Sequence, residues 1–464
     1  MIKLLYGLVF FCLLAGCQNQ QSEQTAKDAA PSPDTAKLET TTAKTPSQPP
    51  APPKTLFNEP IQPVKVELPS QALPYWRDAA GGSRPALVLM SIHPFLQPLG
   101  DSQRADVSEL VTSGSSEDFL NRGNLYRINP TMTNSQTLSA ALDSNLFSRI
   151  IWVFPSRTTP AELKLETFRQ QMLEAGFINE SEGEALQLND GIFSGTVRGT
   201  PFLAIHPQAL TTIEGPVIVH LDLGYFKGLY NNEVRTPLYP TLQQTVAFLQ
   251  PLKWMARSVT LSYSTEEREM SLETRFLINR FAELLEHPEM IDQDLPAAWD
   301  LHSEALYTIN FFLETKVTEL YNRAVQAAPE DSAVLYGLAL RVLRDGNLNE
   351  ALKLIERAAA SDNGYALEYF NLSERAYESG DYATALKLIE KGRPHFPRNP
   401  FIDIQRAQIL LDLGRLDEAH GLLRELKKRP WSAQAHPQIM QHLDNLLAWQ
   451  PEENPAPKAH KGEQ

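Results

Sequence analysis

Short apolar runs and helical patterns alternate along the chain from Ala86 to about Pro288. The runs are rich in β-branched residues, which predicts strands, and the segments between them repeat apolar residues every three or four positions, which predicts helices. The predicted strands are Ala86–Ile92, Ile150–Phe154, Pro216–Leu223 and Arg257–Ser262. This alternation is typical of an α/β domain with a mostly parallel or mixed sheet.

Local signals add two helices and a hairpin to this domain. The run Thr159–Glu162 combines a capping threonine, a proline at the first helical position and a glutamate that closes a capping box, and Gly176 suits the end of that helix. A second helix is predicted to begin at Thr236 in the same way. Gly191–Thr196 and Pro201–Ile205 predict a hairpin at one edge, so we expect a mixed sheet.

A 34-residue repeat follows the predicted sheet. Its turn glycines are Gly346, Gly380 and Gly414, followed in step by Leu348, Tyr382 and Leu416 and then by Ala351, Ala385 and Ala419. This pattern resembles the tetratricopeptide repeat (TPR), in which a glycine turns between two helices and small residues lie where the helices touch. The resemblance implies stacked helix pairs that bury a continuous core.

The repeat resemblance also implies protein binding in a groove lined by the first helix of each pair. Tyr336, Phe370 and Ile404 share one register of these helices, where they either grip a peptide or pack between repeats. One period before the first full repeat, Phe312 stands where the turn glycine belongs, so that unit is degenerate. An apolar stripe at the other end predicts a capping helix, with members Ile439, Leu443, Leu446 and Leu447.

Polar residues follow several of the predicted strands, at the edge where open α/β sheets bind ligands. His93 follows the first strand, and His220 and Asp222 lie on one face of the very apolar strand that they end. The run His220–Phe226 resembles the Asp-x-Asp segment of arginase-like ureohydrolases, with His220 in place of the first aspartate. That resemblance implies a site for Mn or another divalent metal, with His220, Asp222, His93 and Asp101 as ligands and a metal-activated water as nucleophile.

The chain departs from the ureohydrolase pattern, because the family's Asp-x-His-x-Asp signature is absent. The alternative for His220 and Asp222 is a neutral histidine and a carboxylate that are hydrogen-bonded within a packed strand end. No nucleophile-elbow or phosphate-binding glycine motif is present, so the catalytic residues are unknown.

The N-terminus carries a targeting signal. Leu4–Ala15 is apolar and preceded by Lys3, but it is shorter than the roughly 20 residues that span a membrane. The run Leu14–Cys17 resembles the processing site of bacterial lipoproteins, which implies removal of residues 1–16 and a diacylglyceryl group on Cys17. In that family Gln18, rather than Asp, implies the outer membrane, facing the periplasm.

Composition predicts how the rest of the chain is divided. Residues 17–70 are rich in Pro, Thr and Ala and predict a disordered tether, and residues 451–464 predict a disordered tail. The formal charge of −14 and the lack of a basic cluster argue against nucleic acid as a partner. With Cys17 acylated and Cys12 removed, no disulfide is expected.

The sequence thus predicts an α/β domain over residues 71–300, followed by an all-α TPR domain over residues 301–450. The leading hypothesis is a membrane-anchored periplasmic lipoprotein that acts as a protein-binding platform through its repeats. The alternative is a metal-dependent hydrolase of arginase-like fold, or a degenerate version that only binds a ligand.

Overall fold

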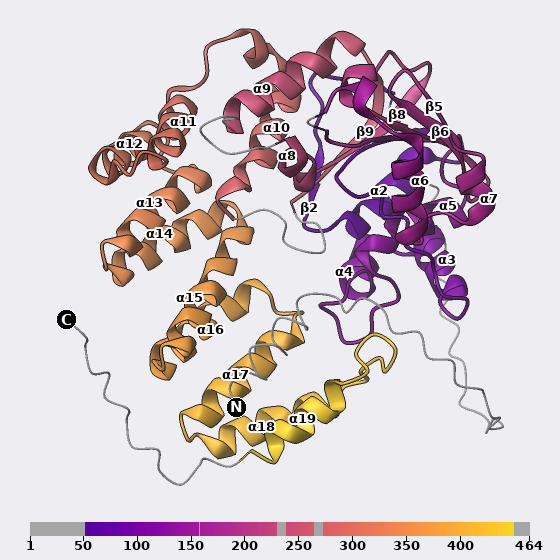
Figure 1. Cartoon of the computed structure of the whole chain (residues 1–464). Coiled ribbons are helices and arrows are strands. Elements are labelled where there is room, and N and C mark those ends of the chain that lie inside the picture. The colour runs from indigo at the N-terminus through magenta and orange to yellow at the C-terminus, as the bar shows by residue number, and fades with distance from the viewer. Residues whose placement is uncertain (1–51, 157, 230–237, 264–271, 450–464) are drawn as a thin grey trace, which may run out of the picture. The chain divides into compact units, whose positions relative to one another are not determined.

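Nine described strands form one mixed sheet in the N-terminal half of the protein (Figure 1). The structure is a computed structural model that describes residues 52–156, 158–229, 238–263 and 272–449. The strands are β1 (Lys54–Thr55), β2 (Val64–Val66), β3 (Ala86–Met90), β4 (Arg149–Val153), β5 (Gln187–Asn189), β6 (Ile192–Val197), β7 (Thr200–Ile205), β8 (Pro216–Asp222) and β9 (Met255–Ser262). Their order is β1-β9-β8-β3-β4-β7-β6-β5, with β2 also paired to β9. The strands from β9 to β7 are parallel, whereas β5 and β6 form the antiparallel edge, which confirms the expected mixed sheet.

Helices cover both faces of the sheet because its central strands are apolar on both sides. Leu87 and Leu89 pack under one set of helices, whereas Val88 and Met90 on the opposite face pack under another. The first set comprises α2 (Leu73–Ala80), α3 (Arg104–Ser113), α4 (Ser116–Arg122), α5 (Thr137–Asp143), α6 (Leu165–Glu174) and the short α7 (Glu180–Glu184). The second set comprises α8 (Leu223–Leu229), α9 (Leu238–Leu249) and α10 (Phe276–Glu286).

Two local predictions need correction. Residues 52–70 belong to the folded body rather than to a tether, because Phe57 is fully buried and β2 pairs with β9. The helix predicted from Thr159 is only a 3-10 turn, Pro160–Glu162, since the backbone at Leu163 is extended, and α6 begins at Leu165. The predictions for Cys17, for the helix start at Thr236 and for residues 451–464 lie outside the described residues.

Helix pairs with the predicted 34-residue register make up the C-terminal half. They are α11 (Ala297–Ile309) with α12 (Glu314–Ala327), α13 (Ser332–Arg344) with α14 (Leu348–Ser361), α15 (Leu367–Glu378) with α16 (Tyr382–Gly392), and α17 (Pro400–Asp412) with α18 (Leu416–Lys427). Gly346, Gly380 and Gly414 turn between helices at φ of 82°, 82° and 72°, a left-handed backbone that glycine adopts without strain. Helix α19 (Ile439–Leu447) buries Ile439, Leu443 and Leu446 in the core of the last repeats.

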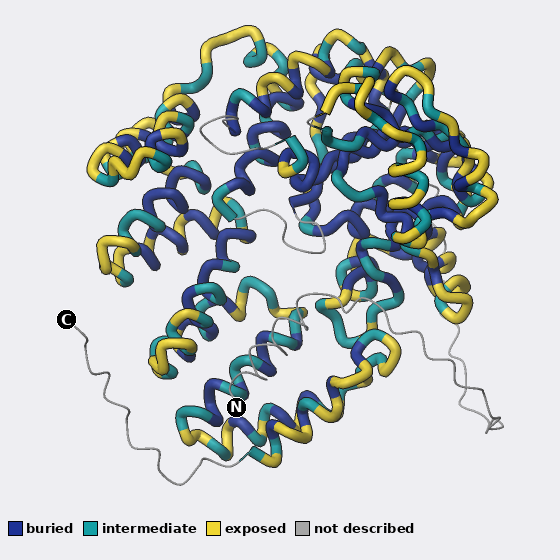
Figure 2. Tube along the Cα trace, in the orientation of Figure 1, coloured by how far each residue is buried: buried dark blue, intermediate teal, exposed yellow. Residues whose placement is uncertain are grey.

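The small residues of the repeat lie where the paired helices approach each other. Ala351, Ala385 and Ala419 are fully buried. Ser373 stands where the neighbouring repeats have Ala339 and Ala407, and its hydroxyl donates a hydrogen bond to the carbonyl oxygen of Ala385 at 2.8 Å. The TPR-like packing predicted from the 34-residue spacing is therefore present, and Figure 2 shows buried backbone on the packed faces of these helices.

One apolar core extends from the sheet into the repeats. The cluster that contains Val88 and Met90 continues through α9, α10 and α13 as far as Leu388 of α16. The described residues from 52 to 449 accordingly belong to a single compact unit, so the boundary expected near residue 300 does not separate two independent bodies. Among the described residues, none of the helices is both long and apolar enough to span a bilayer.

Candidate functional site

The parallel strands end at one edge of the sheet, and this edge holds several polar residues, among them His220 and Asp222 from the sequence analysis. Asp222 ends β8, Ser262 ends β9, and Glu67 and Tyr263 directly follow β2 and β9. In the ladder, Asp222 lies opposite Ser262 and His220 lies opposite Thr260. Such an edge is where an open α/β sheet would bind a ligand, so each side chain there needs a structural account.

His220 is fully buried and has both ring nitrogens in contact with hydroxyl groups. Nδ1 lies 2.8 Å from Thr260 Oγ1, and Nε2 lies 3.3 Å from Ser262 Oγ. The ring also packs edge-on against Trp76, whose Nε1 donates to Thr260 Oγ1 at 2.9 Å. Burial lowers the pKa of His220 to about 3, so the side chain is a neutral member of a packed hydrogen-bond network.

The four proposed metal ligands do not come together. Asp222 is buried and its Oδ1 accepts a hydrogen bond from the Tyr225 backbone at 3.2 Å, at the start of α8. The backbone of His93 donates to Ser91 Oγ, and the side chain of Asp101 is 97% exposed beside Arg104. Within the described residues, no three His, Cys, Asp or Glu side chains are placed to hold a metal ion. The geometry therefore gives no support to the expected Mn site.

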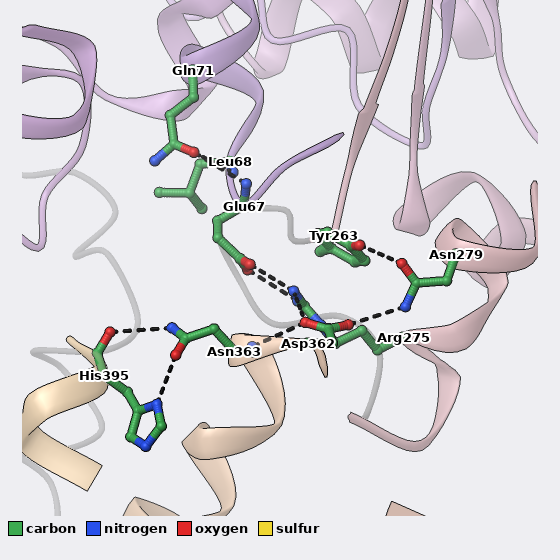
Figure 3. A network of polar contacts seen from close by, with 10 residues as sticks. Glu67, Leu68, Gln71, Tyr263, Arg275, Asn279, Asp362, Asn363 and His395 are labelled. Atoms are coloured by element: carbon green, nitrogen blue, oxygen red, sulfur yellow. Dashed lines mark hydrogen bonds and ion pairs between the residues drawn. The ribbon is translucent and has the colours of Figure 1, made fainter. Parts of the chain in front are cut away.

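The strongest polar cluster at this edge joins the sheet to the repeats (Figure 3). Arg275, next to the start of α10, has a side chain only 4% exposed. Its Nη1 and Nη2 donate to the two carboxylate oxygens of Glu67 at 3.0 and 2.6 Å, and its Nε donates to Asp362 at 2.8 and 2.9 Å. The guanidinium lies 3.5 Å from the centre of the Tyr263 ring. A single buried cation thus connects β2, β9, α10 and the loop after α14.

Further contacts complete the cluster around Asp362. Asn279 donates to Asp362 Oδ2 at 3.1 Å, and the backbone of Gly364 donates to Oδ1 at 3.0 Å. Burial acts to raise the pKa of Asp362. The hydrogen bonds and positive charge of Arg275, together with the hydrogen bonds from Asn279 and Gly364, outweigh the effect of burial, so the pKa of Asp362 is lowered. A Cβ at Gly364 would lie 2.1 Å from Arg275 Cζ, so glycine is required for this close approach.

Two other junctions tie the repeats to the rest of the body. Arg280 of α10 forms an ion pair with Asp331, whose Oδ1 also caps α13 by accepting from the backbones of Ala333 and Val334. At the far end of the array, a ring nitrogen of His436 lies 2.7 Å from the carbonyl oxygen of Arg127, in the loop after α4.

That far junction includes further contacts. The Ser432 backbone donates to the carbonyl oxygen of Ile128 at 3.0 Å, and Arg398 pairs with Glu117 at 2.6 Å. The array is therefore held at two inner turns, those of Asp331 and Asp362, and at its C-terminal end.

The three residues predicted to line a peptide groove take part in packing. Tyr336 is buried and donates its hydroxyl hydrogen bond to Glu368 Oε2 at 2.9 Å. Ile404 is buried in the core of the last repeats, and Phe370 is half-buried against the ring of Phe396. A binding role for the first helices would thus fall on neighbouring, more accessible positions such as Gln405 of α17.

Sequence reasoning missed Glu67, Arg275 and Asp362. Glu67 fell in the predicted tether, and Arg275 follows no recognisable motif. One signal was available in the sequence, because Asn363 stands where Pro397 ends the next repeat, 34 residues later. The turn Asp362–Gly364 therefore departs from the repeat pattern at the sequence level.

No protein-family model matches this chain, and no curated protein matches it. Among solved structures, it is similar to one titled MamA AMB-1 P212121, with 19% identity over 32% of this chain and 81% of that chain and a TM-score of 0.22. It is also similar to a chain of the APC/C hetero-tetramer Cut9-Hcn1, with 12% identity over 48% of this chain and 43% of that chain and a TM-score of 0.24. At these TM-scores the assignment of the repeats rests on the helices of this protein itself.

Proposed function

We propose that this protein is a lipid-anchored lipoprotein of the cell envelope, held by Cys17 at the outer membrane on the periplasmic side, and that it binds other proteins through its helical repeats. The observation that carries the proposal is the use of the sheet edge. Where an α/β enzyme would hold a ligand, Arg275 binds Asp362 of the repeat array, and Glu67 and Tyr263 contact the same guanidinium. In this proposal the α/β region supports the repeat array and fixes its position.

A repeat array that is fixed to the α/β region suits protein recognition, because its helices lose little conformational freedom when a partner binds. Hydrogen bonds fix the array to the α/β region near its middle, through Asp362, and at its C-terminal end, through His436. Preorganisation of this kind raises affinity mainly by lowering the entropic cost of ordering the binding surface. The negative formal charge of the chain favours partners that are not themselves strongly acidic.

The hydrolase alternative gains no specific support from the same edge. Both ring nitrogens of His220 contact hydroxyl groups, and Asp222 caps α8. The decisive check is elemental analysis by mass spectrometry of the full chain, purified without chelator, beside an Asp222→Asn variant. Near-stoichiometric Mn, Zn or Fe that is lost in the variant would return the hydrolase to first place.

The anchor and the platform need separate experiments. Flotation with membranes should require Cys17, so a Cys17→Ser chain should remain in the soluble fraction. Photo-crosslinking in intact cells then tests the platform, with the reactive residue at Gln405 of α17 and a matched control at the exposed Arg424 of the adjacent α18. A discrete product from Gln405 and none from Arg424 supports binding by the first helices. Equal, diffuse labelling at both positions contradicts it.

A further inference from the structure

An exposed apolar tip lies between α11 and α12. Eight large hydrophobic side chains of the described residues are exposed, and four of them fall within seven positions. They are Tyr307, Phe311, Phe312 and Leu313, with exposed fractions of 43%, 47%, 81% and 51%, and we refer to them as the apolar tip. The rings of Tyr307 and Phe311 are in contact, with centroids 5.0 Å apart. Single exposed hydrophobic residues are ordinary, but a contiguous cluster indicates a binding surface.

The backbone of the tip is strained without a gain in packing. Phe312 has φ of 56°, a left-handed conformation that is unfavourable for a bulky side chain. The equivalent turns of the other three repeats use Gly346, Gly380 and Gly414. Phe57 also has a positive φ, but its ring is fully buried, whereas the ring of Phe312 is exposed to solvent. Strain that packing does not compensate is found mainly at functional sites.

The shape and charge of the tip indicate what it contacts. A turn between two helices is convex, so it enters another surface rather than enclosing a segment of a partner. The charged residues beside it pair with one another: Lys316 lies 2.8 Å from Glu304, and Arg344 and Arg341 both pair with Glu314. The tip therefore presents aromatic and aliphatic groups within a rim whose charges are compensated. Aromatic rings at the level of the lipid headgroups, with apolar groups just below, are typical of interfacial membrane contacts.

We propose that the apolar tip inserts into the interfacial layer of the bilayer that carries the anchor, as a second membrane contact. This inference rests on the proposed lipidation of Cys17. From Cys17 to Lys54, where β1 begins, the chain reaches at most about 130 Å, so the body stays near the membrane. At the resulting high effective concentration, even a weakly inserting tip engages the bilayer for much of the time.

The test uses the full lipidated chain, reconstituted in phosphatidylcholine vesicles that contain a nitroxide-labelled quencher lipid. An environment-sensitive fluorophore is attached to Leu313→Cys or, as the matched control, to Met440→Cys on α19, where the native side chain is also exposed. We expect quenching at position 313 and none at position 440. Quenching should be lost when Phe311→Ser and Phe312→Gly are added, and anionic lipid should not be required because the rim charges are paired.

Flotation separates failure of the tip from failure of the anchor. A chain that floats only when Cys17 is intact, but whose label at position 313 is quenched no more than the label at 440, overturns the tip proposal and leaves the anchor standing. The tip would then be a protein contact. Flotation that persists in Cys17→Ser overturns the anchor, and a chain that does not float at all contradicts both proposals.

Discussion

Removal of the Asp362 carboxylate tests how the repeats are mounted on the sheet. In Asp362→Ala, Arg275 loses the partner that it contacts through Nε, and Asn279 loses an acceptor. Glu67 still pairs with Arg275, but its side chain is 45% exposed and provides weaker compensation. Because the guanidinium remains buried, the variant leaves a cation with about half of its charge-assisted hydrogen bonds.

The expected loss of stability follows from these contacts. Breaking a fully buried ion pair by removing one partner costs about 3–5 kcal/mol, because the remaining charge is left uncompensated. Since Glu67 retains part of the compensation, we expect a loss of about 2–3 kcal/mol for Asp362→Ala. A matched control is Lys353→Ala on α14, which removes an exposed ion pair with Glu350 and should cost no more than about 0.5 kcal/mol.

Urea unfolding and hydrogen exchange measure this loss. Exchange should accelerate in the turn Asn363–Ala366 and in α15, with little change in β3 and β4, because the network holds the array rather than the sheet. The lowered pKa of Asp362 means that its contribution is complete above the unfolded pKa of 3.8 and is lost as pH falls through the lower folded value. The variant should therefore be less sensitive to acid in that range. A stability change no larger than that of Lys353→Ala would refute the account of the network.

Three further outcomes follow from other sites. Phe312→Gly should raise stability by about 1 kcal/mol in thermal unfolding, because it relieves a left-handed backbone and removes little packing. A loss of stability instead would show that the Phe312 ring contributes to packing. Gly364→Ala should destabilise by about 2 kcal/mol or more, since its Cβ would displace the buried Arg275 guanidinium; near-neutral stability would contradict this close approach. Burial lowers the pKa of His220, and that of His302 in α11, from 6.5 to about 3. Between these two pH values the unfolded chain takes up a proton on each histidine, whereas the folded chain does not. The free energy of unfolding should then fall on acidification from pH 6.5 towards 3, by about 1.4 kcal/mol per pH unit for each histidine. In unfolding measurements at a series of pH values, His220→Gln should reduce this dependence of stability on pH.

Much of the fold was accessible from sequence because it depends on local periodicity. The central strands are continuous apolar runs and begin within a few residues of the predicted positions, as β3 and β8 show. The repeat was clearer still, since Gly346 and its equivalents adopt the left-handed turn that their spacing predicts. β2 was missed because it is only three residues long, follows a proline-rich segment and depends on pairing with residues of β9 that lie 196 positions later in the chain.

The candidate site was harder to predict, because the chemistry of a strand end depends on neighbours that sequence does not reveal. His220 and Asp222 do share a strand face, as alternation requires, but Thr260, Ser262 and Trp76 come from elsewhere and turn that face into a packed hydrogen-bond network. The same limit applies to Tyr336, where periodicity alone does not distinguish a groove residue from a packing residue. In each case the deciding partner lies on another element.

A buried arginine is an unusual choice for the junction between sheet and repeats, and this choice has a physical consequence. Apolar residues of similar volume would often stabilise such a contact as well or better, because an ion pair must be desolvated. Apolar packing, however, tolerates small rotations, whereas Arg275 keeps its hydrogen bonds only when Glu67 and Asp362 are both in register with its planar guanidinium. We therefore infer that the network determines the orientation of the array more than its stability. An Arg275→Met/Asp362→Leu double variant tests this, since it removes both buried charges. It should recover part of the stability lost in Asp362→Ala, and yet the crosslink from Gln405 should be weakened or absent.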